Sequence, residues 1–385
     1  MDFENNQATK ELNDAVQMVI NNAYLQIQKI DIAPPYLAGA PGAGKTYSIH
    51  DICTEFNWGM VSTHFALKPL EELSGIPQFK KVNVNDEEKL GTIWSYPDVM
   101  GKLYELSPNH EMVIWLLDDI HLCGSVHMAL LYELLTERKL KDHVLPDNIA
   151  IVLAGNFGNN KAGAKTMFSA IMNRVTLMPI FTSYEGWKKN FAMKNNIHLG
   201  IQSFLGNDKY QMFFHEDEQV DAPWGSPRSW TRLSNIVMAL EQWNNEVLND
   251  EDLLYLSQGH VSKNAASEFL QYYKIYNKFD IPDILNKGQD YDLPESPVDK
   301  YALAYAMCSH LAGVKDRNAI NKKFAEVTYK YLKNFPDLGI MIIHELLDME
   351  KLMNKKNIFM SISKELNKIE KGITGKLLKE VSEVS

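Results

Sequence analysis

Residues 39–46 read GAPGAGKT and match the pattern G-x-x-x-x-G-K-[S/T], which binds phosphate groups. The motif follows an apolar run at 35–39 and precedes a helical pattern, so it has the strand–loop–helix order that such a loop requires. Its glycines let backbone N–H groups turn toward an anion at the positive end of the helix. We therefore predict an α/β fold of the P-loop NTPase type.

The members of this phosphate-binding loop have separate predicted roles. Lys45 is predicted to reach the β and γ phosphates of ATP, and Thr46 to ligate Mg²⁺. For the motif alone, the alternative is a tight glycine turn without a ligand. The predicted ATP-contacting residues are Gly39, Ala40, Pro41, Gly42, Ala43, Gly44, Lys45, Thr46 and Tyr47.

A second apolar run, residues 112–120, contains two adjacent acids, Asp118 and Asp119. A carboxylate at the C-terminal edge of a central strand lies beside the phosphates in nucleotide-binding sheets. We predict that Asp118 holds Mg²⁺ through water and that Asp119 polarises the attacking water. Since a helical pattern follows, the alternative for Asp119 is a helix N-cap.

The chain has an α/β part followed by a helical part. Four strand patterns alternate with helical patterns, which predicts a mainly parallel sheet; they are residues 35–39, 59–65, 112–120 and 148–156. Two hairpins are predicted at 79–94 and 137–152. The predicted boundaries are 1–30 for an N-terminal helix, 31–183 for the core, 184–285 for a helical lid, 286–297 for a linker and 298–385 for a helical C-terminal region.

Composition excludes several classes of protein. The net charge of -10 argues against a surface built mainly to coat nucleic acid, although a local basic groove can occur within an acidic whole. No apolar run approaches the roughly 18 residues that span a bilayer, and no signal pattern opens the chain, so we expect no membrane partner and a cytoplasmic location. The scattered Cys53, Cys123 and Cys308 are predicted to be reduced core thiols.

From residue 30 to 285 the chain resembles the AAA+ ATPases, and more narrowly the MoxR-like branch with CbbQ, NorQ and phage-encoded relatives. The segment LKPLEELSGIPQF is similar to the approach to that branch's helix-2 insertion, which the hairpin at 79–94 would form. The hairpin at 137–152 matches the one before the family's first sensor. For a phage-encoded relative, the cytoplasm would be that of the host.

This resemblance implies three further site residues. Asn156 would be the polar sensor of the γ-phosphate, Arg174 the arginine finger and Arg228 the second sensor in the lid. Alternatives are a salt bridge for Arg174 and an exposed helix-start charge for Arg228. The chain has only five arginines, of which these are two; the others are Arg138, Arg232 and Arg317.

The resemblance also implies a function, with one departure from the family pattern. It implies a homo-oligomeric ring, a hexamer by analogy, that couples Mg-ATP hydrolysis to remodelling or maturation of a protein partner, for example one with a von Willebrand factor A domain. Most relatives carry Asp-Glu where this chain has Asp118-Asp119, so hydrolysis is expected to be slow or partner-dependent. The alternative is a DNA-directed machine, such as a phage helicase loader or translocation motor. A simple P-loop kinase would not need Asn156, Arg174 and Arg228 together.

Overall fold

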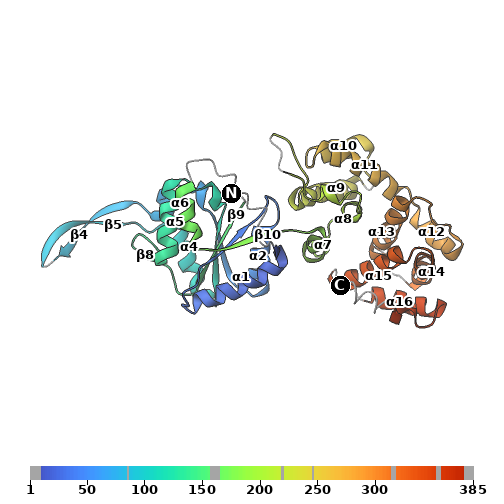
Figure 1. Ribbon diagram of the computed structural model, residues 1–385, viewed down its shortest axis with the longest axis horizontal. Coiled ribbons are helices and arrows are strands. Elements are labelled where there is room, and N and C mark those ends of the chain that lie inside the picture. Colours follow the sequence, from blue (N-terminus) through green and yellow to red (C-terminus); the bar gives the residue numbers. More distant parts are fainter. Residues whose placement is uncertain are drawn as a thin grey trace. The chain divides into compact units, whose positions relative to one another are not determined.

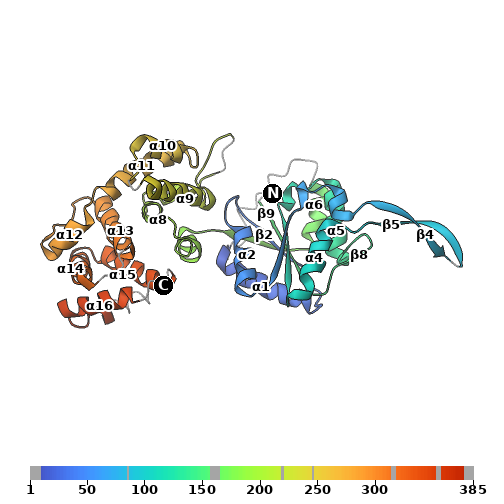
Figure 2. The same ribbon diagram turned by 180° about the vertical axis from the view of Figure 1, so that it is seen from behind.

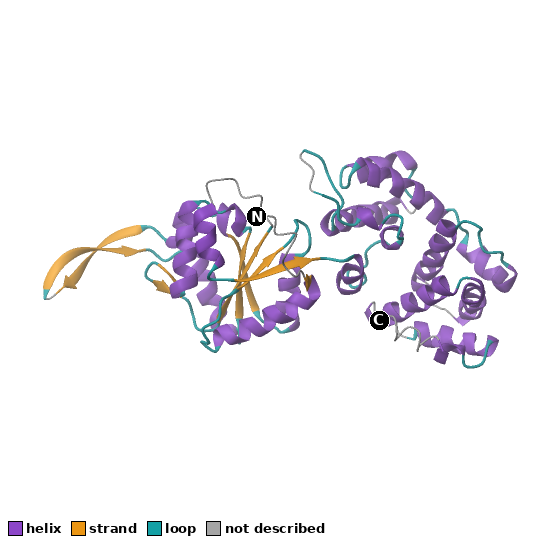
Figure 3. Ribbon diagram, viewed as in Figure 1, coloured by secondary structure: helices purple, strands orange, loops and turns teal. Residues whose placement is uncertain are grey.

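The computed structural model divides the chain into two compact units, Met1–Thr182 and Ser183–Ser385. Figure 1 colours the first unit from blue to green and the second from yellow-green to red. The strands all belong to the first unit, whereas the regular elements described in the second are helices (Figure 3). The described residues are 10–84, 86–156, 165–217, 221–244, 247–313, 318–352 and 357–376.

A six-stranded parallel sheet forms the centre of the first unit, with the order β1-β10-β2-β9-β6-β3. Its strands are β1 (Lys10–Glu11), β2 (Pro35–Ala38), β3 (Gly59–His64), β6 (Val113–Asp118), β9 (Ile149–Gly155) and β10 (Thr176–Phe181). The four predicted strands are confirmed as β2, β3, β6 and β9. The sequence analysis missed β1, which has only two residues, and β10, which contains Pro179.

Helices cover both faces of this sheet, which explains why its central strands are apolar throughout. In β6, Ile114 and Leu116 pack on one face, while Trp115 and Leu117 pack on the other. The first face is covered by α1 (Leu12–Ile27) and α2 (Lys45–Glu55). The second face is covered by α4 (Asp98–Leu106), α5 (Ser125–Glu137) and α6 (Lys165–Met172). Figures 1 and 2 show these two layers of the first unit from opposite sides.

Two hairpins leave the core. The first, β4 (Pro77–Val84) with β5 (Glu87–Trp94), is antiparallel and projects beyond the helices of its unit (Figure 1), so this prediction is confirmed. The second is much shorter than predicted, because only β7 (Lys139–Leu140) and β8 (His143–Val144) pair with each other. Residues 149–152 belong instead to β9, where they are buried and pair with β6.

A buried amide on α1 satisfies the backbone of β9. The side chain of Gln26 donates from Nε2 to the carbonyl of Ile151 at 2.9 Å, and its Oε1 accepts from the Ile151 N–H at 2.8 Å. The ladder between β2 and β9 begins only at Leu153, so this part of β9 relies on Gln26 on that side. The side chain thus extends the sheet's hydrogen bonding where the neighbouring strand has not begun.

Gln26→Ala is expected to lower the free energy of unfolding of the first unit by about 2–4 kcal/mol, because two buried backbone groups lose their partners. Urea unfolding of the full chain, followed by tryptophan fluorescence, measures this change. Gln17→Ala is the matched control on the exposed face of α1 and should change stability by less than about 0.5 kcal/mol. Equal losses in both variants would contradict the role given to Gln26.

One continuous hydrophobic core runs through the second unit, from Tyr184 to Ile373. Both the segment 184–285 and the segment 298–385 contribute to it, and their division by a linker at 286–297 stays a prediction. None of the helices in the described ranges is both long and apolar enough to cross a bilayer. The helices are α7 (Tyr184–Trp187), α8 (Leu199–Gly206), α9 (Pro227–Asn244), α10 (Asp250–Gln258), α11 (Lys263–Asn277), α12 (Ile281–Lys287), α13 (Pro297–Gly313), α14 (Asn318–Asn334), α15 (Pro336–Leu352) and α16 (Ile358–Ile369).

An ion pair between Lys188 and Glu345 lies inside this core. Lys188 Nζ also donates to Tyr305 Oη at 3.0 Å, so α15 and α13 are both tied to the segment that follows α7. Burial alone would lower the pKa of Lys188, but the Glu345 carboxylate raises it above its ordinary value. Such a pair is costly to break, since either partner alone would be a buried charge.

The three cysteines are free and buried, as predicted. Burial raises the pKa of Cys53 and of Cys123 to about 12, so neither is a thiolate at neutral pH. Cys308 lies in the core of the second unit. They contribute apolar packing.

Candidate nucleotide-binding site

The phosphate-binding loop joins β2 to α2 and has the backbone geometry that its glycines allow. Gly42 and Gly44 have φ values of 78° and 95°, in the left-handed region that favours glycine. A Cβ at Gly39 would lie 2.8 Å from the carbonyl oxygen of Ile180 in β10. The backbone therefore favours glycine at the two motif positions, Gly39 and Gly44, and also at Gly42 between them. It ends at the N-terminus of α2, where helix N–H groups attract anions.

Lys45 and Asn156 lie in direct contact. Lys45 Nζ donates to Asn156 Oδ1 at 3.0 Å and to the carbonyls of Gly39 and Ala40, both at 2.9 Å. The lysine is buried, and these acceptors offset the cost of removing its charge from water. Asn156 follows β9, the neighbour of β2 in the sheet, so strand order explains how residues 111 positions apart meet.

Thr46 and Asp118 form a second contact between the loop and the sheet. Thr46 Oγ1 donates to Asp118 Oδ2 at 2.6 Å, and Asp118 is buried at the end of β6. A hydroxyl and a carboxylate oxygen this close fit Mg²⁺, which prefers hard oxygen ligands and completes its shell with water and substrate phosphates. In the described ranges no group of three or more His, Cys, Asp or Glu side chains could hold a metal.

Asp119 stands at a sharp turn immediately after β6. Its φ of 56° is left-handed, a conformation that aspartate tolerates better than most residues. It precedes the short 3₁₀ turn Ile120–Leu122, but its side chain makes no capping hydrogen bond there. Instead Asp119 Oδ2 lies 3.2 Å from His64 Nδ1 at the end of β3. The carboxylate is one-third exposed and accessible to solvent at the strand edge.

Two histidines of the site were missed by the sequence analysis. His64 ends β3 and is paired in register with Asp118, which brings its ring to the neighbouring Asp119. His121 Nδ1 accepts a hydrogen bond from the Asn156 N–H at 3.2 Å and so links the turn after β6 to the predicted sensor. Neither position carries a spacing signal, because each contact depends on which strands become neighbours.

Glycine at position 155 is required beside these groups. A Cβ there would lie 2.6 Å from Tyr36 Oη and 3.1 Å from His121 Nδ1. The absence of a side chain lets the ring of His121 approach the end of β9. The end of β9 is thus constrained by packing at Gly155 as well as by the contact of Asn156 with Lys45.

The predicted arginines are distributed over both units. Arg174 lies at the end of α6 in the first unit and rests against α5. Arg228 is exposed at the start of α9 in the second unit, and Arg232 is exposed one turn later. Arg138 turns inward, where its Nη2 donates to the carbonyl of Ile149 at 2.5 Å. Arg317 lies outside the described residues.

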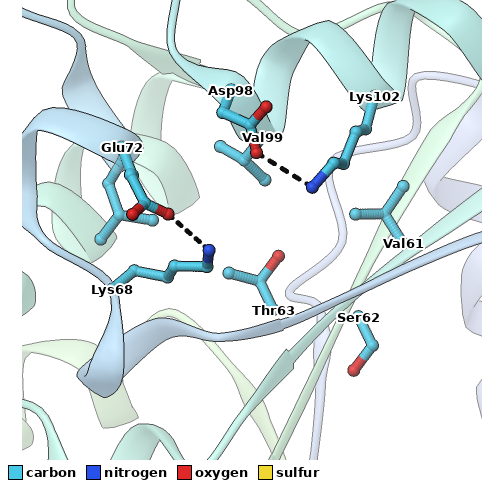
Figure 4. Close-up of a pocket in the computed structure, with 9 residues that line it drawn as sticks. Val61, Ser62, Thr63, Lys68, Glu72, Asp98, Val99 and Lys102 are labelled. Carbon is cyan, nitrogen blue, oxygen red and sulfur yellow. Dashed lines mark hydrogen bonds and ion pairs between the residues drawn. The ribbon is translucent and has the colours of Figure 1, made fainter.

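A separate hollow between β3, α3 (Leu70–Ser74) and α4 is lined by charged residues (Figure 4). Lys68 pairs with Glu72, and Lys102 Nζ lies 2.9 Å from Asp98 Oδ2. The hydrogen bond to Glu72 raises the pKa of Lys68, and that to Lys102 lowers the pKa of Asp98. Because these charges are matched with one another, the hollow offers little attraction for a charged ligand. The candidate nucleotide-binding site lies at the strand ends instead.

No sequence profile of a protein family matches the chain, and no curated protein matches it. Among solved structures it is similar to the Holliday junction branch migration motor RuvB of Thermotoga maritima, at 15% identity and a TM-score of 0.33, over 80% of this chain and 83% of that one. It is also similar to Cdc6p of Pyrobaculum aerophilum, at 12% identity and a TM-score of 0.39, over 88% and 89%. A third is Hsp104 in its closed state with ATPγS and casein, at 14% identity and a TM-score of 0.39, over 62% and 46%.

The fold of this chain follows from its own geometry. A parallel sheet, a phosphate-binding loop between strand and helix, and a helical region after the sheet agree with the predicted fold class. The MoxR-like branch stays a prediction at this point.

Proposed function

We propose that this chain is a Mg-ATP hydrolase of the AAA+ class, and within it of the MoxR-like branch. The observation that carries the proposal is the meeting of four groups at one sheet edge. Lys45 Nζ is 3.0 Å from Asn156 Oδ1, and Thr46 Oγ1 is 2.6 Å from Asp118 Oδ2. These are the groups that a triphosphate, its metal and a γ-phosphate sensor require within one site.

Each residue has a defined role in the proposed reaction. Lys45 would bind the β and γ phosphates, and Mg²⁺, held by Thr46 and Asp118, would offset phosphate charge. Asp119 would accept a proton from water as the water oxygen bonds to the γ-phosphorus and the bond to the bridging oxygen breaks, giving ADP and phosphate. His64 fixes one carboxylate oxygen of Asp119 and so limits its motion.

We further propose that the active site is completed by a second copy of the chain. Arg174 would act on the nucleotide of a neighbouring subunit as an arginine finger, and Arg228 would act as the second sensor from the lid. A head-to-tail contact forms a closed ring when its rotation closes, and the family resemblance implies a hexamer. The cycle would be coupled to remodelling or maturation of a protein partner, with a von Willebrand factor A protein as the candidate adaptor.

The charge distribution favours a protein partner over DNA. The chain carries a net charge of -10. Two of the three lysines on the projecting hairpin are paired, since Lys81 lies 2.8 Å from Glu88 and Lys89 lies 3.2 Å from Glu87. Nucleic-acid binding depends on cations that neutralise phosphates. ATPase stimulation by DNA, but not by a protein client, would favour the helicase-loader or translocation-motor alternative.

Lys45→Ala is expected to weaken Mg-ATP binding about 100-fold or more, because it removes the ammonium that pairs with the phosphates. Isothermal titration calorimetry with Mg-ATP measures the affinity. Lys45 is buried and braces two loop carbonyls, so circular dichroism must first show that the variant is folded. Lys102→Ala, an exposed lysine on α4, is the matched control. Equal affinities for ATP in wild type and a folded Lys45→Ala variant would refute the assignment.

A further inference from the structure

The guanidinium of Arg174 is held in one orientation by three groups, which we call the Arg174 cradle: Tyr132, Thr136 and the carbonyl of Ala170. Arg174 Nε donates to Thr136 Oγ1 at 3.0 Å, and Nη1 donates to the Ala170 carbonyl at 3.0 Å. Nη2 donates to Tyr132 Oη. The guanidinium carbon also lies 3.8 Å from the centre of the Tyr132 ring. The ring of Tyr132 thus packs on the face of the planar guanidinium, and the three hydrogen bonds hold its edges.

Two helices build this cradle. Tyr132 and Thr136 are four residues apart on α5, so their side chains share one face of that helix. Ala170 belongs to α6, which packs against α5. The backbone N–H of Arg174 donates to the carbonyl of Ile171 at 2.8 Å, so the main chain is anchored as well. A long, flexible side chain is thus held at the surface by rigid elements.

The charge of Arg174 is not matched locally. No carboxylate in the described part of the chain forms an ion pair with it. The cradle uses three of the five N–H donors of the guanidinium, all with neutral acceptors. Tyr132 and Thr136 are exposed, so the cradle lies on the surface and not in the core. A fixed and uncompensated cation at a surface is complementary to an anion supplied from outside the chain.

We infer that Tyr132 and Thr136 are positioning residues that aim Arg174 at the terminal phosphate of a nucleoside triphosphate bound by a second copy of this chain. This inference rests on the proposed function. A pre-oriented guanidinium loses less rotamer freedom when it engages the transition state, and this raises kcat. The affinity for ATP does not depend on the cradle, because the binding groups lie on the other subunit.

Steady-state ATPase kinetics of cradle variants test this inference. Tyr132→Ala is expected to lower kcat about 10- to 100-fold with an unchanged KM, the pattern of a group that acts only in the transition state. Tyr132→Phe keeps the aromatic ring, so its kcat should fall less than that of Tyr132→Ala. Thr136→Val keeps the side-chain shape but loses the hydroxyl acceptor, and should lower kcat several-fold. Tyr255→Ala, an exposed helical tyrosine of the second unit, is the control and should keep the wild-type kcat.

A double variant and a mixing experiment separate positioning from structural damage. Adding Tyr132→Ala to Arg174→Ala should slow hydrolysis no further, because both remove the same interaction. Mixing Tyr132→Ala with Lys45→Ala should restore activity, since the Lys45→Ala subunit supplies an intact cradle to its neighbour. If Tyr132→Ala has instead damaged its own nucleotide site, mixing cannot restore activity, and that result would overturn the inference.

The outcomes also separate this inference from the proposed function. If Arg174→Ala hydrolyses ATP slowly while Tyr132→Ala and Thr136→Val keep the wild-type kcat, the cradle has no positioning role. The assignment of Arg174 as the arginine finger is then still supported. If Arg174→Ala itself keeps the wild-type kcat, both the arginine-finger role of Arg174 and the positioning role of the cradle are refuted.

Discussion

Asp119→Asn is expected to leave Mg-ATP bound while hydrolysis falls about 10²- to 10⁴-fold, the range that general-base groups contribute. Asparagine has nearly the same shape as aspartate, but its amide cannot accept a proton from water at neutral pH. Asp118→Asn should instead weaken the Mg²⁺-dependent binding of ATP. The Asp118 carboxylate accepts the hydrogen bond from Thr46, and these two side chains are the proposed Mg²⁺ ligands. Calorimetry with Mg-ATP and a phosphate-release assay give affinity and rate for both variants.

Asp119→Glu is the informative counterpart. It adds the methylene that glutamate supplies at this position in most members of the proposed MoxR-like branch, so we expect hydrolysis at the wild-type rate or faster. If Asp119→Asn hydrolyses ATP as fast as the wild type, Asp119 has no part in activating water.

Arg174→Ala is expected to bind ATP normally and to hydrolyse it about 10³- to 10⁵-fold more slowly, as when an arginine finger is removed. Among the described residues, the side chain donates hydrogen bonds to Tyr132, Thr136 and the Ala170 carbonyl, outside the core, so the variant should fold and assemble like the wild type. Light scattering after size-exclusion chromatography checks assembly, and single-turnover hydrolysis measures the rate.

Arg174→Lys supplies the control for charge. Lysine keeps the positive charge but lacks the planar fork that the cradle holds, so it should remain slow. Full activity in Arg174→Lys would mean that charge alone suffices, and full activity in Arg174→Ala would remove the finger assignment.

Much of the first unit could be predicted from the sequence because its strongest signals are local. The apolar runs that became β2, β6 and β9 are buried along their whole length, so their composition marks them as central strands. The strand β3 lies at the edge of the sheet and alternates buried with more exposed residues, so its signal was weaker. The strand β10 is only partly buried and contains a proline, and so lacked this signal. The hairpin predicted at 137–152 was too long because Ile149 and its apolar neighbours fit a buried parallel strand as well as a hairpin arm.

The site was predictable where a motif fixes residue type and spacing. The phosphate-binding loop and the paired aspartates identified Lys45, Thr46 and Asp118, whereas Asn156 was predicted from the family resemblance. These groups meet as the pairs Lys45–Asn156 and Thr46–Asp118. His64 and Tyr132 could not be found in this way. His64 reaches Asp119 only because β3 lies beside β6, and Tyr132 meets Arg174 only because α5 packs against α6.

Mixing two inactive variants tests the central claim, that one subunit completes the active site of another. Arg174→Ala keeps the phosphate-binding loop, and Lys45→Ala keeps the finger. In an equal mixture, about a quarter of the sites in a randomly assembled ring should join an intact loop to an intact finger, and activity should recover to about that fraction of the wild-type rate. The account would be contradicted if the mixture is shown to co-assemble but recovers no ATPase activity. It would also be contradicted if the wild-type protein hydrolyses ATP at its full rate as a monomer.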